Sequence, residues 1–378
     1  MARRRSSVSI LAILVLVHLY IGLRLLPGME LGLFGMLLGI LLLALSAVLV
    51  RIGLVAPSLR RSRWSEPLTW AGLLAMGFFS SLLVLTFLRD LVLLALTLAG
   101  AGGPAITHDS ALAVPLLALL VTAIGFINAR RLARVVKVDV PIAGLPQELA
   151  GYAIAQISDI HVGPTIKRAY LNAIVTKVNS LKPDAIAVTG DLVDGSVQRL
   201  AIHTAPLGRL AAPDGVFFVT GNHEYYSGAE QWIAEVRRLG LRVLLNEHVI
   251  RRRGQAALMI AGVTDYTAQH FNPAHRSDPR QAAAGAPEDV AVKVLLAHQP
   301  RSAPAAADAG FDLQLSGHTH GGQFFPWNFF VPLQQPFVAG LNRVRSLWVY
   351  TSRGTGYWGP PKRFGAPSEI TLVRLVPA

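Results

Sequence analysis

The chain has 378 residues, enough for two domains, and 52% of them are hydrophobic while only 15% are charged. It contains no cysteine, which excludes disulfides and thiolate metal sites. The formal net charge is +13. Many of the arginines flank apolar stretches, so we attribute them to membrane topology and anionic lipid headgroups, and we do not expect a nucleic-acid partner.

Four apolar stretches in the first third of the chain reach the length of about 20 residues that a membrane-spanning helix needs. They are residues 8–26, 30–50, 67–88 and 111–127. Three arginines precede the first stretch, as in a signal peptide, but no small-x-small cleavage site follows, so we predict an uncleaved anchor. Residues 91–99 are too few to cross again and either lie at the interface or lengthen the third helix.

The distribution of Lys and Arg predicts the orientation of these spans. Basic residues collect before the first span, between the second and third, and after the fourth: Arg3, Arg4, Arg5, Arg51, Arg60, Arg61, Arg63, Arg130, Arg131, Arg134 and Lys137. The opposite loops carry only Arg24, and Arg89 beside Asp90. We therefore predict that residues 1–137 form a multi-pass domain in the cell (inner) membrane, with the following domain in the cytoplasm. Three or five spans would place that domain on the other side.

From residue 138 the composition becomes mixed, and short β-like runs alternate with amphipathic helices. Strands are predicted at residues 152–158, 185–189, 216–220, 242–245, 258–262, 292–297, 313–316, 347–351 and 370–375. Helices are predicted at 168–181 and 229–239. Residues 138–378 should thus form an α/β or α+β domain of packed layers. Residues 269–289, rich in Ala, Pro, Asp and Arg, are predicted to be a mobile surface loop.

Five polar motifs follow apolar runs of this second domain. They are Asp159-Ile160-His161, Gly190-Asp191-Leu192-Val193-Asp194, Gly221-Asn222-His223-Glu224, the single His298, and Gly317-His318-Thr319-His320. Asp159 and His161 are two residues apart and would face the same way in extended backbone, and His318 and His320 repeat this spacing. Two cations about 3.5–4 Å apart need a bridging carboxylate, imidazoles and an oxygen or amide donor. The motifs therefore predict one dinuclear metal centre.

These motifs match the patterns D-x-H, G-D-x-x-D, G-N-H-E/D, H and G-H-x-H without departure. In this the chain resembles the calcineurin-like metallophosphoesterase superfamily over about residues 154–375, and within it the membrane-anchored bacterial branch with several N-terminal helices. The resemblance implies a four-layer αββα sandwich. It also implies a metal-dependent phosphatase or phosphodiesterase that cleaves phosphomonoester, diester or pyrophosphate bonds through a hydroxide bridging two metal ions. Those ions could be Mn, Fe, Zn or Co, which this mixture of ligands does not separate.

The resemblance further implies a role for each matching residue. Asp159, His161, Asp191 and His320 would bind one ion, and Asp191, Asn222, His298 and His318 the other. His223 would bind no metal; it would contact the substrate together with Asn222, and would stabilise the phosphoryl group or protonate the leaving oxygen. Asp194 and Glu224 would hydrogen-bond metal-bound histidines or loop amides, although a structural turn role for Asp194 is as plausible.

Other polar residues lie outside these motifs. We predict that the remaining histidines lie at the surface: His108, His203, His248, His270 and His275. Asp265 should cap its loop rather than approach the site. Arg353, Lys362 and Arg363 either contact the non-reacting part of a phosphorylated substrate or form an exposed basic turn.

The segment 323–346 is rich in aromatic residues and poor in charge. It contains Phe324, Phe325, Trp327, Phe329, Phe330 and Phe337. One interpretation is a hydrophobic loop packed on the sheet. The other is a lip that faces the lipid bilayer beside the active site and favours lipid-linked substrates over a phosphorylated small molecule.

Two other classes of protein are alternatives. A catalytically retired membrane scaffold or binding protein with the same fold would show degenerate ligands, and none is degenerate. A transporter or channel should carry charge pairs within its spans, and the sequence suggests none. His18, within the first span, is expected to be a packed or interfacial histidine.

Overall fold

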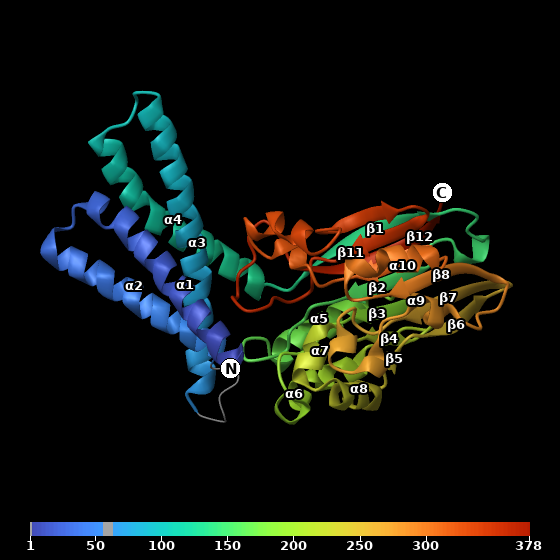
Figure 1. Cartoon of the computed structure of the whole chain (residues 1–378). Helices are drawn as coiled ribbons and strands as arrows, with labels where there is room; N and C mark the ends of the chain where they lie inside the picture. Colours follow the sequence, from blue (N-terminus) through green and yellow to red (C-terminus); the bar gives the residue numbers. More distant parts are fainter. Residues whose placement is uncertain (1, 56–62) are drawn as a thin grey trace. The chain divides into compact units, whose positions relative to one another are not determined.

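The computed structural model describes residues 2–55 and 63–378, and the chain divides into two compact units. The first comprises Met1–Ile127 and the short segment Gly359–Lys362, and the second comprises Asn128–Trp358 and Arg363–Ala378. Figure 1 shows the elements of both units. Arg60 and Arg61, on which the predicted orientation partly depends, lie outside the described residues.

The first unit is built from four apolar helices: α1 (Ala2–Leu25), α2 (Gly32–Val55), α3 (Ser65–Leu98) and α4 (Pro104–Arg130). Each is long and apolar enough to cross a bilayer, as predicted. The 34 residues of α3 form one continuous helix. At about 1.5 Å per residue it exceeds a hydrocarbon core about 30 Å thick. Residues 91–98 therefore lengthen the third helix.

Small and polar residues fix the packing of these helices. Gly53 and Gly72 bring α2 and α3 together so closely that a Cβ on either would overlap the backbone of the other. His18 is buried, with Nδ1 2.8 Å from the Leu14 carbonyl and its ring stacked on Phe79. It is a packed histidine, as expected.

One ion pair joins residues that the sequence analysis placed in the loops between the spans. Arg24, in the last turn of α1, donates to Asp90 of α3 at 2.9 Å. Arg89 donates to the carbonyls of Arg24 and Thr107 and to Ser110 Oγ. These bonds join the end of α1 to α3 and α4, so the pair tethers helices and satisfies their polar ends.

The second unit contains two six-stranded mixed sheets (Figure 1). The first has the order β1 (Arg134–Ile142), β12 (Glu369–Pro377), β2 (Ala153–Ile157), β3 (Ala185–Thr189), β4 (Val216–Val219) and β5 (Arg242–Val243). The second has the order β10 (Gly340–Val344), β11 (Leu347–Thr351), β9 (Leu313–Ser316), β8 (Val290–Leu296), β7 (Ala256–Gly262) and β6 (Glu247–Arg253).

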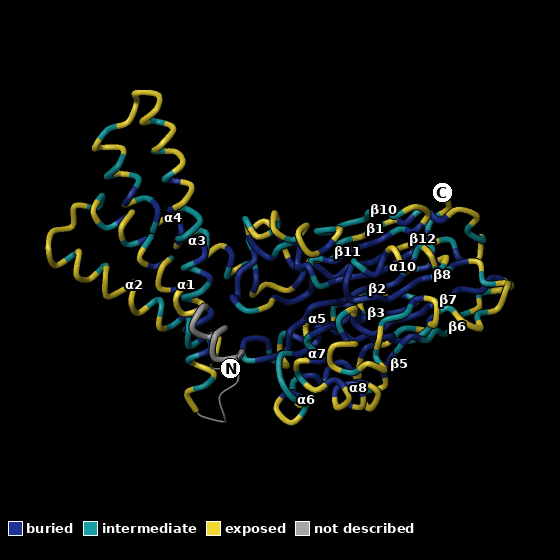
Figure 2. Tube along the Cα trace, viewed as in Figure 1, coloured by how far each residue is buried: buried dark blue, intermediate teal, exposed yellow. Residues whose placement is uncertain are grey.

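Helices cover the outer face of each sheet. The first sheet packs on α5 (Arg168–Ser180), α6 (Val197–Thr204) and α8 (Ala229–Arg238), and the second on α9 (Pro279–Ala283) and α10 (Ala303–Asp308). A third hydrophobic cluster, with Ile154 of β2 and Leu258 of β7 among its members, lies between the sheets. The result is the αββα sandwich that the sequence predicted, with buried strands and more exposed outer helices (Figure 2).

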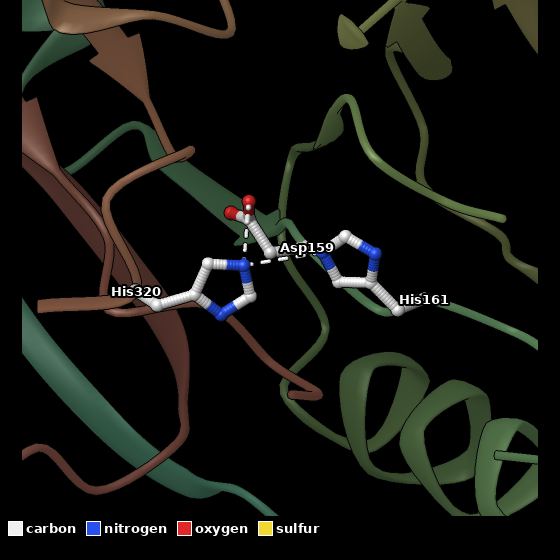
Figure 3. Close-up of side chains that lie close together, drawn as sticks. All are labelled: Asp159, His161 and His320. Atoms are coloured by element: carbon white, nitrogen blue, oxygen red, sulfur yellow. Dashed lines mark hydrogen bonds and ion pairs between the residues drawn. The ribbon is translucent and has the colours of Figure 1, made fainter. Parts of the chain in front are cut away.

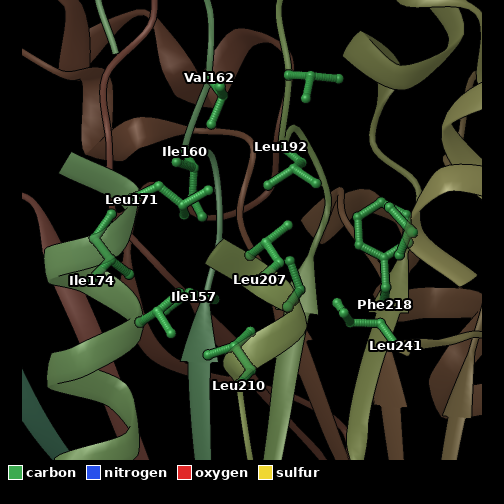
Figure 4. Close-up of a cluster of buried hydrophobic side chains, with 14 of the residues drawn as sticks. Ile157, Ile160, Val162, Leu171, Ile174, Leu192, Leu207, Leu210, Phe218 and Leu241 are labelled. Atoms are coloured by element: carbon green, nitrogen blue, oxygen red, sulfur yellow. The ribbon is translucent and has the colours of Figure 1, made fainter. Parts of the chain in front are cut away.

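The sandwich has a dense core because its central strands are apolar on both faces. All five residues of β3 are buried. Ile157 at the end of β2 and Leu171 and Ile174 of α5 belong to the cluster between the helices and the first sheet (Figure 4). This packing fixes the strand ends from which the polar motifs emerge.

Two sequence predictions about this unit need correction. Three strands, β1, β6 and β10, were not predicted, and β1 begins at Arg134, within the part assigned to the membrane domain. Residues 269–289, predicted to be a surface loop, contain short helical elements: the 3₁₀ turn at Pro273–His275 and α9, whose first turn is capped by the Asp278 carboxylate at the Arg280 and Gln281 amides.

Candidate metal centre

The five motifs meet at one end of the sandwich. They follow the carboxyl ends of β2, β3 and β4 in the first sheet and of β8 and β9 in the second. The three strands of the first sheet are parallel to one another, and so are the two strands of the second. The carboxyl ends of parallel strands open at the same edge of a sheet, which is where such folds form their sites. Residues as distant in sequence as His161 and His320 are thereby brought into contact.

The two-residue spacing within the motifs predicts extended backbone, but the structure differs at these positions. Five residues have φ between 51° and 71°: Asp159, His161, Asp191, His318 and His320. This left-handed conformation costs on the order of 1–3 kcal/mol for a residue other than glycine, and it persists where the surroundings impose it. The side chains still converge, as the short distances among their imidazole and carboxylate atoms show.

One cluster consists of Asp159, His161 and His320 (Figure 3). The Nε2 atoms of His161 and His320 are 3.1 Å apart, and His320 Nε2 lies 3.4 Å from Asp159 Oδ1. All three residues are buried. Two imidazole nitrogens and a carboxylate facing one another suit a divalent cation of the first transition row or zinc.

A second cluster consists of Asp191, His298 and His318. His298 Nε2 is 3.1 Å from Asp191 Oδ2 and 3.2 Å from His318 Nδ1. His298 Nδ1 lies 2.8 Å from the Thr189 carbonyl. Because a carbonyl only accepts, Nδ1 carries a proton, and Nε2 is the atom presented to the cluster.

Asp191 lies between the two clusters. Its Oδ2 is 3.1 Å from His298 Nε2 and 3.9 Å from His161 Nε2. Burial alone would raise the pKa of Asp191, but the charges of His298, His223 and His161 hold it well below the usual value, so this carboxyl is ionised. Gly221 permits the approach, since a Cβ there would overlap the Asp191 carboxylate.

The remaining predicted ligand, Asn222, also suits a cation. Its side-chain oxygen is buried and has no hydrogen-bond partner, a state that is costly unless something else binds it. Glu224 is not a ligand: its carboxylate accepts from the amides of Gly221, Asp191 and Leu192, and burial raises its pKa to about 7. The buried donors thus fit a dimetal site, and Glu224 holds the loops that present it.

Asp194 connects this centre to His223. Its Oδ1 accepts from His161 Nδ1 at 3.0 Å and from His223 Nδ1 at 2.6 Å, so the structure favours a tuning role over a structural turn. Burial disfavours a charged imidazole, but the bond to Asp194 and the charge of Asp191 raise the pKa of His223 to about 9. His223 Nε2 points toward the centre, 3.9 Å from Asp191 Oδ2.

Replacing Asp194 by Asn or Ala tests this connection. We expect turnover to fall about 10–100-fold, as is typical when the hydrogen-bond partner of a metal-binding histidine is lost. Asn keeps an acceptor without its charge, so Asp194→Asn should be the milder change. Turnover and metal affinity should be measured on both variants. An Asp194→Ala protein with the turnover and the metal affinity of the wild type would contradict the role assigned to Asp194.

Predictions for the remaining histidines and Asp265 had mixed outcomes. His270 is exposed, as predicted, whereas His108, His203, His248 and His275 are half-buried. His275 Nδ1 is 2.9 Å from Tyr225 Oη, and His248 Nδ1 is 2.8 Å from the Ala282 carbonyl. Asp265 caps its loop at the Thr267 amide and holds Gln299, as expected.

Both interpretations of the basic residues near the C-terminus were wrong for Lys362 and Arg363, which are buried. Lys362, in the helical unit, donates to the Gly77 carbonyl at 2.8 Å and to Ser81 Oγ. Arg363, in the second unit, donates to the carbonyls of His320 and Arg353 and lies 3.1 Å from His320 Nδ1. Arg353 pairs with Glu369 at 2.9 Å.

Two neighbours of the site were missed by the sequence analysis: Tyr226 and Trp358, which lie beside His223. Tyr226 offered a signal, since it follows His223 by three residues and so lies on the same side of a helix. Trp358 approaches from a distant segment, and no local pattern marks it.

Comparison with known proteins agrees with this site. The calcineurin-like phosphoesterase family model matches residues 152–322. A transmembrane protein with metallophosphoesterase domain from Danio rerio is 40% identical over 271 residues, 68% of this chain and 62% of that protein. An uncharacterized metallophosphoesterase of Campylobacter jejuni is 33% identical over 326 residues, 81% of this chain and 82% of that protein.

Among solved structures, the 5'-nucleotidase precursor from Thermus thermophilus matches with a TM-score of 0.40 and 15% identity, over 59% of this chain and 55% of that one.

The chain belongs to the calcineurin-like metallophosphoesterases, as the family model and the relatives show. Its similar proteins come from animals as well as bacteria, and it spans 62% of the Danio rerio relative's length.

Proposed function

We propose that the protein is a membrane-anchored hydrolase of phosphomonoester, diester or pyrophosphate bonds that uses two divalent metal ions. The observation that supports this best is the position of Asp191 between the imidazoles of His161 and His298. The proposed ligands are Asp159, His161 and His320 for one ion, and Asn222, His298 and His318 for the other, with Asp191 shared. Mn, Fe, Zn and Co all suit these donors.

The cations and the residues of the chain have different roles in the proposed reaction. When bound, the two cations would neutralise charge on the phosphoryl group and activate a water. Asp191 and the histidines hold the cations, and Glu224 and Asp194 hold the ligand loops. As a water oxygen forms its bond to phosphorus and the bond to the leaving oxygen breaks, His223, oriented by Asp194, gives its Nε2 proton to the leaving oxygen.

We infer that the catalytic domain lies in the cytoplasm. Four spans return the chain to the side on which it started, and the segments on that side carry most of the basic residues, among them Arg51, Arg63, Arg130, Arg131 and Arg134. Cytoplasmic loops of membrane proteins carry such an excess.

The aromatic segment supports an amphiphilic substrate. Phe325, Trp327, Phe329 and Phe330 are between 41% and 66% exposed. Phe324 is buried and Phe337 packs against the second sheet, so the two ends of the segment are anchored while its middle is open. We propose that this middle part is a lip that contacts lipid and admits lipid-linked phosphoesters to the site.

A comparison of two substrates tests this proposal. The full chain in lipid nanodiscs, loaded with each candidate metal in turn, should hydrolyse a lipid-linked phosphodiester with a higher kcat/KM than the same headgroup ester without its chains. Replacing both Phe329 and Phe330 by Ser should reduce that preference. Equal turnover of both substrates would remove the reason to propose the lip, and absence of hydrolysis with every metal would contradict the proposed function itself.

A further inference from the structure

Two exposed aromatic rings contact His223, the proposed proton donor. The centroid of the Tyr226 ring lies 5.2 Å from that of His223 and the centroid of Trp358 lies 5.8 Å away, each ring steeply inclined to the imidazole. The His223 side chain is 15% exposed, whereas Tyr226 is 62% and Trp358 54% exposed. Large aromatic residues are usually much better buried, and exposed apolar surface of this kind marks binding sites.

Each of the two residues has a further contact beside the one to His223. Tyr226 is on α7 (Asn222–Ser227), the short helix that also presents Asn222 and His223. Its other side contacts Phe271 at 5.6 Å, and Phe271 is itself 52% exposed. Tyr226 therefore keeps a fixed position relative to the proton donor without being covered.

Trp358 is fixed by a pair of reciprocal hydrogen bonds. Its amide donates to Gln323 Oε1 at 2.8 Å, and Gln323 Nε2 donates to its carbonyl at 2.8 Å. Gln323 is buried and follows His320 by three residues. These bonds hold the main chain of Trp358 to the loop of a proposed metal ligand, and the indole contacts His223 from that position.

We propose that Tyr226 and Trp358 form the subsite for the leaving group and select phosphoesters whose leaving group has apolar surface. The inference rests on the proposed function, because it takes His223 as the donor to the leaving oxygen. Whatever carries that oxygen must then lie beside the two rings. The rings offer apolar faces and one phenol but no charge, so they favour an alkyl chain or an aromatic ring over a charged or strongly hydrated group.

Phosphate esters of three alcohols of similar acidity test this: ethanol, 2-phenylethanol and octanol, each as a monoester and as a methyl diester, with release of the named alcohol as the measured reaction. With the metal-loaded full chain, kcat/KM should be on the order of 10-fold higher for one or both apolar esters than for the ethyl ester, which matches the energy of a well-placed aromatic contact. The phenyl and octyl arms distinguish an aromatic leaving group from a lipid-like chain.

Tyr226→Ala and Trp358→Ala should each move the ratio of kcat/KM for the apolar ester to kcat/KM for the ethyl ester toward one. Because both side chains are exposed, the variants should fold. Ile202→Ala, which removes an apolar side chain of the same 62% exposure from α6, should keep the wild-type ratio. Octylphosphonate should inhibit the wild type more strongly than ethylphosphonate, and the two variants should lose this difference. This measurement of binding does not require turnover.

A wild-type enzyme that hydrolyses all three esters equally would overturn the subsite, and so would variants that keep the full preference. Failure to hydrolyse any ester with two metals bound would instead overturn the proposed function, and the subsite with it.

Discussion

Replacing Asp191 by Asn is expected to abolish metal binding and activity together. The carboxylate is the only charged side chain within 4 Å of imidazoles from both clusters among the described residues, at 3.1 Å from His298 and 3.9 Å from His161. Asn preserves the shape but presents one neutral oxygen. Two cations would then share no anion in a buried site, where unpaired charge is costly.

The expected loss of turnover is about 10³-fold or more. Metal stabilisation of a phosphoryl transition state amounts to several kcal/mol, and about 1.4 kcal/mol corresponds to a factor of ten. Metal content per chain and kcat/KM, measured on the same preparation, check this. Asp139→Asn is the matched control, because that carboxylate is 49% exposed and forms an ion pair with Arg374, far from the metal ligands in sequence. An Asp191→Asn protein that retains two ions would contradict the bridging role.

Replacing His223 by Ala should spare the metal ions and reduce turnover about 10²–10⁴-fold, the usual cost of losing a positioned acid or base. His223 contacts the centre through its backbone amide, which donates to Asp191 Oδ1 at 2.9 Å. Ala keeps that amide, so Asp191 should remain in place. The change therefore separates proton transfer from metal binding.

His270→Ala is the control for this variant, since His270 is exposed and lies outside the centre. Metal content, KM and kcat of both proteins should be compared with the wild type. We expect a reduced kcat with two ions still bound for His223→Ala and no change for His270→Ala. If His223→Ala turned over at the wild-type rate, His223 would not be the proton donor.

The central strands could be predicted from the sequence because each is a short apolar run that ends in a glycine or a polar residue. β3, β9 and β11 have the predicted bounds. β1, β6 and β10 could not be found in this way, since their residues are largely half-exposed and show no apolar run. β1 also owes its existence to β12, more than 200 residues later, and such pairing leaves no local signal.

The candidate site was predictable to the extent that its residues directly follow strands. Every proposed ligand stands within four residues of a strand end, so spacing and residue type indicated the motifs, and the family resemblance implied the individual ligands. Arg363 was predicted either to contact the substrate or to lie in an exposed basic turn, because arginine seldom lies in a core without partners. Its partners are carbonyls of surrounding turns, and these exist only once the chain has folded.

The most direct test of the account is to locate the metal ions. Crystals of the full chain, grown with the metal that supports activity, should give two anomalous peaks about 3.5–4 Å apart. One should lie within bonding distance of Asp159, His161 and His320, the other of Asn222, His298 and His318, with Asp191 contacting both. A single peak, or two peaks with no shared carboxylate, would contradict the dinuclear centre.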